Sequence, residues 1–213
     1  MPMTDVQRKI LVSGAAELGV PLDAEQVEKL LTLLDLVAEW NQKFNLTGIK
    51  EPVAMVQKHL LDSLTIQRFI RGPFVTDVGT GAGFPGLPLA IVNPTLRFTL
   101  IDSTAKKIRF VEHAVTALGL AEVTAVCVRA EQYVAPQRSS TVVSRALSSI
   151  PEFVATAGHL CAKNGQMLAM KGKDPIAELD ALPRGWRAKA IERLHVPGLA
   201  DERHVVILLP PEA

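Results

Sequence analysis

The stretch Asp77-Val78-Gly79-Thr80-Gly81-Ala82-Gly83-Phe84-Pro85-Gly86 decides the fold. It follows a short apolar segment, 74–78, and precedes a second apolar segment, 87–92, that reads as a helix. A glycine-rich turn between a strand and a helix bends tightly and lets a ligand approach the bare backbone. A turn that binds nothing explains four glycines in eight positions poorly. We therefore expect a ligand at this loop.

The loop fits two nucleotide-binding patterns. Gly81-x-Gly83-x-x-Gly86 matches the dinucleotide fingerprint, in which the backbone holds a pyrophosphate. Asp77-x-Gly79-x-Gly81-x-Gly83 resembles motif I of the class I S-adenosylmethionine-dependent methyltransferases. The carboxylate of Asp77 favours the second pattern, because it would repel a pyrophosphate and attract the amino group of a methionine moiety.

Acidic residues after the next two expected strands support nucleoside binding. Asp102 ends the strand expected at 97–101 and follows Gly81 by 21 positions. A spacing of about 20 places an acid near the ribose hydroxyls of a nucleotide, although the same carboxylate could cap the helix expected from Lys106. Ala130 and Glu131 follow the third strand at the same edge, where they would border an adenine or lie in an exposed loop.

Strands and helices alternate around this loop. Residues 1–72 read as helical, with Asp23 and Gln26 as a capping box and a further helix that starts near Pro52. From residue 73 on, we expect strands at 74–78, 97–101, 123–128, 141–144, 166–170, 187–196 and 204–209, and helices at 87–92, 106–118, 151–161 and 175–182. The last two strands lack an intervening helix and should pair antiparallel at one edge.

This alternation predicts an α/β fold. Right-handed βαβ units build a mostly parallel sheet that has helices on both faces. Together with the resemblance of the Asp77–Gly83 loop to motif I, it leads us to expect a Rossmann-like class I methyltransferase fold with seven strands. We expect the chain to divide into an N-terminal helical cap, 1–72, and an S-adenosylmethionine-dependent methyltransferase domain, 73–213.

The composition is that of an ordinary globular protein. Of the 213 residues, 48% are hydrophobic, and 23 Lys and Arg balance 22 Asp and Glu to a net charge of +1. These values exclude a disordered chain and a highly basic nucleic-acid coat, but they allow a local basic patch. Cys127, expected within a strand, and Cys161, expected on a helix, are interpreted as reduced core thiols.

Nothing in the sequence predicts export, a membrane span or a metal site. The N-terminal residues are mixed polar and charged, and the longest uncharged run, 78–96, contains too many Gly and Pro for a spanning helix. No His, Cys and Asp cluster has the spacing of metal ligands. We expect a cytoplasmic protein with no membrane partner and no metal.

The sequence around the fourth and fifth strands narrows the chemistry. The Asn/Asp-Pro-Pro-aromatic run common in exocyclic amine methylation is replaced by Ser144-Arg145-Ala146-Leu147, and neither cysteine is placed as a nucleophile for a pyrimidine carbon. The N7 of guanine has a free lone pair and no proton to lose, so positioning alone would support its methylation. Arg145 and Lys171, at the carboxyl ends of these strands, are the candidate catalytic residues. Arg145 would bind the cofactor carboxylate, a phosphate or a base edge, and a surface salt bridge is the alternative for both residues.

Several short segments together resemble the RsmG (GidB) family of bacterial small-subunit rRNA guanine-N7 methyltransferases. The resemblance covers nearly the whole chain and is carried by Asn45-Leu46-Thr47, His59-x-x-Asp62-Ser63-Leu64, Asp77 to Gly86, Asp102-Ser103-x-x-Lys106-Lys107, Ser144-Arg145-Ala146, Lys171-Gly172 and Glu202-Arg203-His204. It implies S-adenosylmethionine as the cofactor and methyl transfer to N7 of a specific guanine in 16S rRNA. With the loop residues argued above, the expected cofactor-binding set is Asp77, Gly79, Gly81, Gly83, Phe84, Asp102, Ser103, Thr104, Ala130, Glu131 and Arg145.

The substrate contacts are expected on two segments. His59, Asp62 and Ser63 share a helical face, where they would line the substrate cleft or anchor the cap to the sheet. Together with His59, the basic residues Lys106, Lys107 and Arg109 are the expected RNA contacts.

Guanine N7 lies in the deep, narrow major groove of A-form RNA, so we expect the target in a loop or as a flipped base. The expected partner is small-subunit rRNA or the 30S particle, bound by a monomer. An NAD-dependent oxidoreductase and a non-enzymatic RNA-binding or ribosome-binding module are the alternatives.

Overall fold

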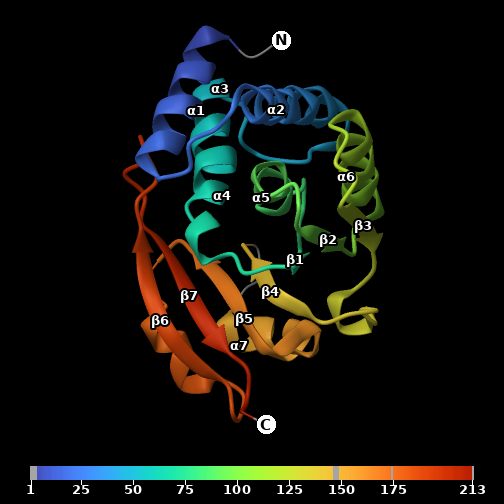
Figure 1. The fold of residues 1–213 in the computed structure, drawn as a ribbon, viewed down its shortest axis with the longest axis vertical. Helices are drawn as coiled ribbons and strands as arrows, with labels where there is room; N and C mark the ends of the chain where they lie inside the picture. Colours follow the sequence, from blue (N-terminus) through green and yellow to red (C-terminus); the bar gives the residue numbers. More distant parts are fainter. Residues whose placement is uncertain (1–3, 146–148, 174, 213) are drawn as a thin grey trace.

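A seven-stranded sheet in the order β3-β2-β1-β4-β5-β7-β6 lies at the centre of the computed structural model, which describes residues 4–145, 149–173 and 175–212 (Figure 1). The strands are β1 (Phe74–Val78), β2 (Arg97–Asp102), β3 (Val123–Cys127), β4 (Ser139–Ser144), β5 (Cys161–Lys171), β6 (Arg187–Leu194) and β7 (Arg203–Leu209). The first five strands are parallel, and β7 runs antiparallel to both β5 and β6. The predicted fold, with its antiparallel pair of late strands at one edge, is confirmed.

Helices bury both faces of the sheet. On one face, α5 (Gly86–Val92) and α6 (Ala105–Ala117) pack near β2 and β3, and on the other α7 (Ile150–Ala157) packs against β5. Successive strand residues point to opposite faces, so Leu100 joins the first apolar cluster and Ile101 the second. Because β1 to β5 are parallel, their carboxyl ends share one edge of the sheet. A ligand would bind at this edge in this kind of sheet.

The N-terminal helices pack over this edge and over α5 and α6 (Figure 1). They are α1 (Asp5–Glu17), α2 (Ala24–Phe44) and a helix built of α3 (Pro52–Met55), the π-helical η1 (Val56–Leu61) and α4 (Asp62–Leu64). The predicted capping box is confirmed, since Gln26 N donates to Asp23 Oδ1 at 2.8 Å and Asp23 N to Gln26 Oε1 at 3.1 Å. The apolar faces of these helices join the core of the sheet in one continuous cluster.

Three expectations about local structure were wrong. Cys127 is exposed, because it is the last residue of the edge strand β3. Cys161 is buried as expected but begins β5, since α7 ends at Ala157 and is followed by the 3₁₀ turn η4 (Gly158–Leu160). The helix expected at 175–182 is the 3₁₀ helix η5 (Ile176–Ala181).

Two further 3₁₀ turns are η2 (Gln67–Phe69) and η3 (Ala130–Gln132). Among the helices within the described ranges, none is long and apolar enough to cross a membrane.

Candidate functional site

The glycine loop carries the chain from β1 into α5. Gly79, Gly81 and Gly83 have φ values of 70°, 60° and 85°, in the left-handed region that other residues rarely adopt. Gly79 N and Thr80 N both donate to the carbonyl of Ile101, at 2.8 and 3.0 Å, which ties the loop to the end of β2. The loop is thus held in a conformation that depends on glycine.

Asp77 braces this loop from within. It is fully buried, and its Oδ2 accepts hydrogen bonds from Thr80 Oγ1 at 2.7 Å and from Gly86 N at 2.9 Å. Burial raises its pKa to about 6, against the lowering effect of these two donors. The carboxylate therefore accepts the hydrogen bond of the amide at the start of α5, and a pyrophosphate would need this donor. This arrangement favours the methyltransferase pattern over the dinucleotide one.

A first cavity, of about 180 Å³, lies at the carboxyl ends of β1, β2 and β3. Five of the residues expected to bind the cofactor line it, namely Gly79, Asp102, Ser103, Ala130 and Glu131. Glu152 of α7 adds a third carboxylate, and Arg129 supplies the one cationic side chain among the described residues of its lining. Such a lining attracts a positively charged ligand. We refer to this space as the acidic cavity.

Asp102 joins the glycine loop to the start of α6. Its Oδ2 accepts from Gly81 N at 3.0 Å and its Oδ1 from Thr104 N at 2.8 Å, while Lys107 Nζ lies 3.8 Å from Oδ2. The same carboxylate therefore holds the start of α6 and lines the acidic cavity.

A second cavity, of about 320 Å³, lies beneath the N-terminal helices. Its described lining comes from the segment before α3, from η1 and α4, from the ends of β4, β5 and β6, and from the start of β7: Ile49, Lys58, His59, Asp62, Arg145, Met170, Lys171, Gly172, Leu194, Arg203 and His204. Four of these side chains are Lys or Arg and one is a carboxylate, so we refer to it as the basic cavity. The two cavities flank the junction of β1 and β4, which are adjacent strands.

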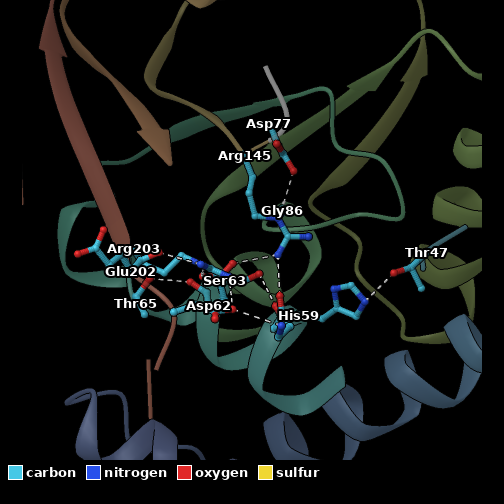
Figure 2. Close-up of polar contacts among 12 residues, drawn as sticks. Thr47, His59, Asp62, Ser63, Thr65, Asp77, Gly86, Arg145, Glu202 and Arg203 are labelled. Carbon is cyan, nitrogen blue, oxygen red and sulfur yellow. Dashed lines mark hydrogen bonds and ion pairs between the residues drawn. The ribbon is translucent and has the colours of Figure 1, made fainter. Parts of the chain in front are cut away.

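Asp62 is a buried carboxylate between two arginines. It is 2% exposed, its Oδ2 lies 3.1 Å from Arg145 Nη1, and its Oδ1 accepts from Arg203 Nε at 3.1 Å. Figure 2 shows the two guanidinium groups approaching it, Arg145 from just beyond β4 and Arg203 from the start of β7. Arg145 Nη1 also donates to the carbonyl of Lys58, at 2.9 Å. Asp62 thus lines the basic cavity and also joins the cap to the end of β4 and the start of β7.

His59 reaches the glycine loop from the cap. Its ring stacks on Phe84, with centroids 4.5 Å apart. Its Nε2 lies 3.1 Å from Thr47 Oγ1 (Figure 2). Asn41 fixes Thr47 through two 2.9 Å hydrogen bonds to its backbone. Burial, and secondarily the charge of Arg145, lowers the pKa of His59 to about 3. The imidazole is therefore neutral near pH 7.

The remaining expected residues lie around these cavities. Lys171 Nζ is 2.7 Å from Glu178 Oε1, so the salt-bridge alternative is realised, although Lys171 also lines the basic cavity. Phe84 is buried behind His59 and does not line the acidic cavity. On α6, Lys106 and Arg109 are exposed, and Lys107 is partly buried beside Asp102.

Sequence reasoning missed Arg203 and Lys58 as cavity residues. The only signal for Arg203 was the segment Glu202-Arg203-His204, and for Lys58 there was none. Ala146, which ends one of the family segments, lies outside the described residues. Within the described ranges, no group of three His, Cys, Asp or Glu side chains is placed to hold a metal ion.

Comparisons with known proteins agree on one family. A family model described as rRNA small subunit methyltransferase G matches residues 26–206. The chain is 44% identical over 211 residues to ribosomal RNA small subunit methyltransferase G of Nitrosococcus oceani, with 99% of each chain covered. It is 47% identical over 201 residues to the protein of that name from Methylococcus capsulatus, covering 94% of this chain and 98% of that one.

Solved structures show the same fold at low sequence identity. The glycopeptide N-methyltransferase MtfA, crystallised with S-adenosylmethionine, superposes with a TM-score of 0.60 at 12% identity, over 72% of this chain and 87% of that one. This likeness supports the architecture alone, which is the class I methyltransferase fold.

Proposed function

The chain belongs to the rRNA small subunit methyltransferase G family, and we propose that it transfers the methyl group of S-adenosylmethionine to N7 of a guanine in 16S rRNA. The observation that carries this proposal is the placement of the acidic cavity beside the basic one. Asp77 of β1 pairs in register with Val143 of β4, so Gly79 and Arg145 leave adjacent strands at the same level. A methyl donor and a polyanionic acceptor would meet at this junction.

The acidic cavity is proposed to hold the nucleoside part of the cofactor. Asp102 would bind the ribose hydroxyls, as an acid at this position does in related folds, and Ala130 and Glu131 would border the adenine. The positively charged sulfur of S-adenosylmethionine is bonded to the ribose, so it would lie near the carboxylates of this lining, which favour a cation. When bound, it supplies an electrophilic methyl group.

The glycine loop is proposed to shape the methionine side of that site. Gly79, Gly81 and Gly83 keep the backbone bare, and Phe84 and Asp77 hold the loop from below. The charge of Asp77 would favour the cofactor amino group without direct exposure, because a buried carboxylate acts through a medium of low polarity. Arg145, which leaves the adjacent strand, would face the cofactor carboxylate or the acceptor.

The reaction proposed here needs no general base. The N7 lone pair of guanine is free, so the protein's task is to hold that atom in line with the methyl group. Arg145 and Lys171, which line the basic cavity, are proposed to act by holding the acceptor. His59 is neutral and would contact the base without adding charge.

The acceptor is proposed to be a guanine in a loop of small-subunit rRNA, free or in the 30S particle. Residues 1–72 would form a cap over the basic cavity, and residues 73–213 the methyltransferase domain. Lys106, Lys107 and Arg109 on α6 would contact RNA phosphates. We propose that the protein acts in the cytoplasm as a monomer.

The test is methylation of small-subunit rRNA prepared from a strain that lacks this protein. The purified chain and S-adenosylmethionine are expected to produce N7-methylguanosine, detected by nucleoside mass spectrometry. A methyl group on another atom, or none, would contradict the proposal. Calorimetry is expected to show S-adenosylhomocysteine binding that weakens in Asp102→Ala. Tight binding of NADH without binding of S-adenosylhomocysteine would favour an oxidoreductase instead.

A further inference from the structure

Three of the cations that line the basic cavity pair with carboxylates that lie outside its lining. Lys58, Lys171 and Arg203 each pair with a carboxylate, at 3.3 Å from Asp201, 2.7 Å from Glu178 and 3.6 Å from Asp201. Neither Asp201 nor Glu178 belongs to the lining of the cavity. The acid that does line it, Asp62, has a side chain only 3% exposed. The surface that a ligand would meet is therefore positively charged.

This cavity extends well beyond the cofactor side of the sheet. Arg203 begins β7, which lies three strands from β1 in the sheet order. At about 4.8 Å per strand, this places it roughly 14 Å from the strand that carries the glycine loop. Arg203 therefore lies on the acceptor side, outside the acidic cavity.

We propose that the basic cavity binds a phosphate group of the RNA next to the target guanine, with Arg203 and Lys58 as its contacts beside Arg145. Asp62 is the positioning residue of this site. The inference rests on the proposed function, which supplies an RNA acceptor. A single phosphate fits the chemistry, because guanidinium groups donate paired hydrogen bonds to phosphate oxygens.

Asp62 sets the positions of both guanidinium groups. Each of its oxygens contacts a different arginine at 3.1 Å. The π-helical turn of η1 assists, because Asp62 N donates to Gln57 O. The carbonyl of Lys58, which an α-helix would pair with that amide, accepts from Arg145 Nη1 instead. Two strand ends and one helix are thereby fixed around one space, as a preformed anion site requires.

The test compares Arg203→Ala with Arg8→Ala, a control on α1 whose arginine is also ion-paired, with Glu28 at 2.6 Å, and lies outside both cavities. Arg203→Ala is expected to raise the KM for 16S rRNA at least tenfold and to leave the Kd for S-adenosylhomocysteine within twofold of the parent value. In direct binding to the same RNA, the slope of log K against log salt is expected to fall by about one. Arg8→Ala should change none of these quantities.

Two further variants separate positioning from folding. Arg203→Lys keeps the charge, so it should restore the salt slope while recovering only part of the affinity. Asp62→Asn keeps the size of the side chain and should raise the KM for RNA more than it lowers kcat. Thermal unfolding of each variant shows whether the fold is retained.

The outcomes distinguish two sources of the anion. If Arg203→Ala raises the Kd for S-adenosylhomocysteine tenfold and leaves the KM for RNA unchanged, the anion is the cofactor carboxylate and the inference is overturned. An unchanged KM together with an unchanged salt slope overturns it as well. The proposed function can fail separately. If Arg203→Ala weakens RNA binding but the parent protein transfers no methyl group, the proposed function is contradicted and the phosphate site is supported.

Discussion

The imidazole of His59 lies nearly parallel to the ring of Phe84, with the planes inclined by 11° and the centroids 4.5 Å apart. One ring belongs to the cap and the other to the glycine loop, and both are buried. The stack therefore couples the position of the loop at β1 to that of the helix that carries Asp62.

Replacing Phe84 by Leu should disturb this coupling. We expect the free energy of unfolding to fall by about 1–2 kcal/mol, as for other shortened core side chains, and kcat to fall about tenfold because the loop is displaced. Phe98→Leu is the matched control, since Phe98 is 1% exposed and lies on β2, away from both cavities. It should cost similar stability at unchanged kcat. Equal kcat in the two variants would show that the stack has no catalytic consequence.

The pH dependence of stability should report the burial of His59. Its pKa is about 3 in the folded protein and 6.5 in the unfolded chain, so the unfolded state binds the extra proton between these values. The contribution to stability is complete above pH 6.5 and is lost as the pH falls, by up to about 1.4 kcal/mol per pH unit. His59→Gln should lack this slope. Urea unfolding at pH 5, 6 and 7 measures the difference, and a constant difference would speak against a buried neutral imidazole.

Asp77 should show the opposite dependence. Its folded pKa is about 6, above the usual 3.8, so the folded state binds the extra proton in this window. The stabilisation by the neutral acid is complete below pH 3.8 and is lost as the pH rises through 6, about 3 kcal/mol in all. Asp77→Asn can still accept from Thr80 and Gly86, so at pH 7.5 it should be at least as stable as the parent but bind S-adenosylhomocysteine more weakly. Lower stability of Asp77→Asn at that pH would contradict the raised pKa.

Two glycines separate backbone strain from ligand binding. Gly81 and Gly119 both have positive φ, 60° and 64°, and an added Cβ meets nothing closer than 4.0 Å in either case. Alanine at each position should therefore cost a similar strain, about 1 kcal/mol. Of the two variants, only Gly81→Ala should weaken the binding of S-adenosylhomocysteine, which calorimetry measures. Equal affinities for the two variants would remove Gly81 from the cofactor site.

The basic residues of α6 provide a test of the RNA surface. Lys106 and Arg109 are exposed, whereas Lys107 is left in place because it lies beside Asp102. The double variant Lys106→Ala, Arg109→Ala should lower the slope of log K against log salt by up to about two. Arg97→Ala, at the opposite end of β2, should leave that slope unchanged. An unaltered slope in the double variant would identify these residues as a solvated helix face.

Local spacing predicted most of the architecture and singled out five of the residues that line the acidic cavity. Patterns within a few residues predict the strands, their alternation with helices, and the capping box of Asp23. Such patterns work because neighbouring side chains determine the local backbone geometry. The same rules wrongly predicted that Cys127 is buried. Its exposure depends on the position of β3 at the edge of the sheet, which local spacing does not predict. They also missed the π-helical turn around His59. The apolar residues of this segment still fit the spacing of an ordinary helix, so the pattern gives no sign of the turn.

The sequence by itself determined the glycine loop, the acid at Asp102 and the family, because each rests on residue types at short, fixed spacing. Only the tertiary structure decided that Asp62 joins Arg145 and Arg203, which lie 83 and 141 positions away along the chain. The reason is physical: a buried carboxylate needs compensating charge, and the partners that supply it are selected by which strand ends the sheet brings beneath the cap.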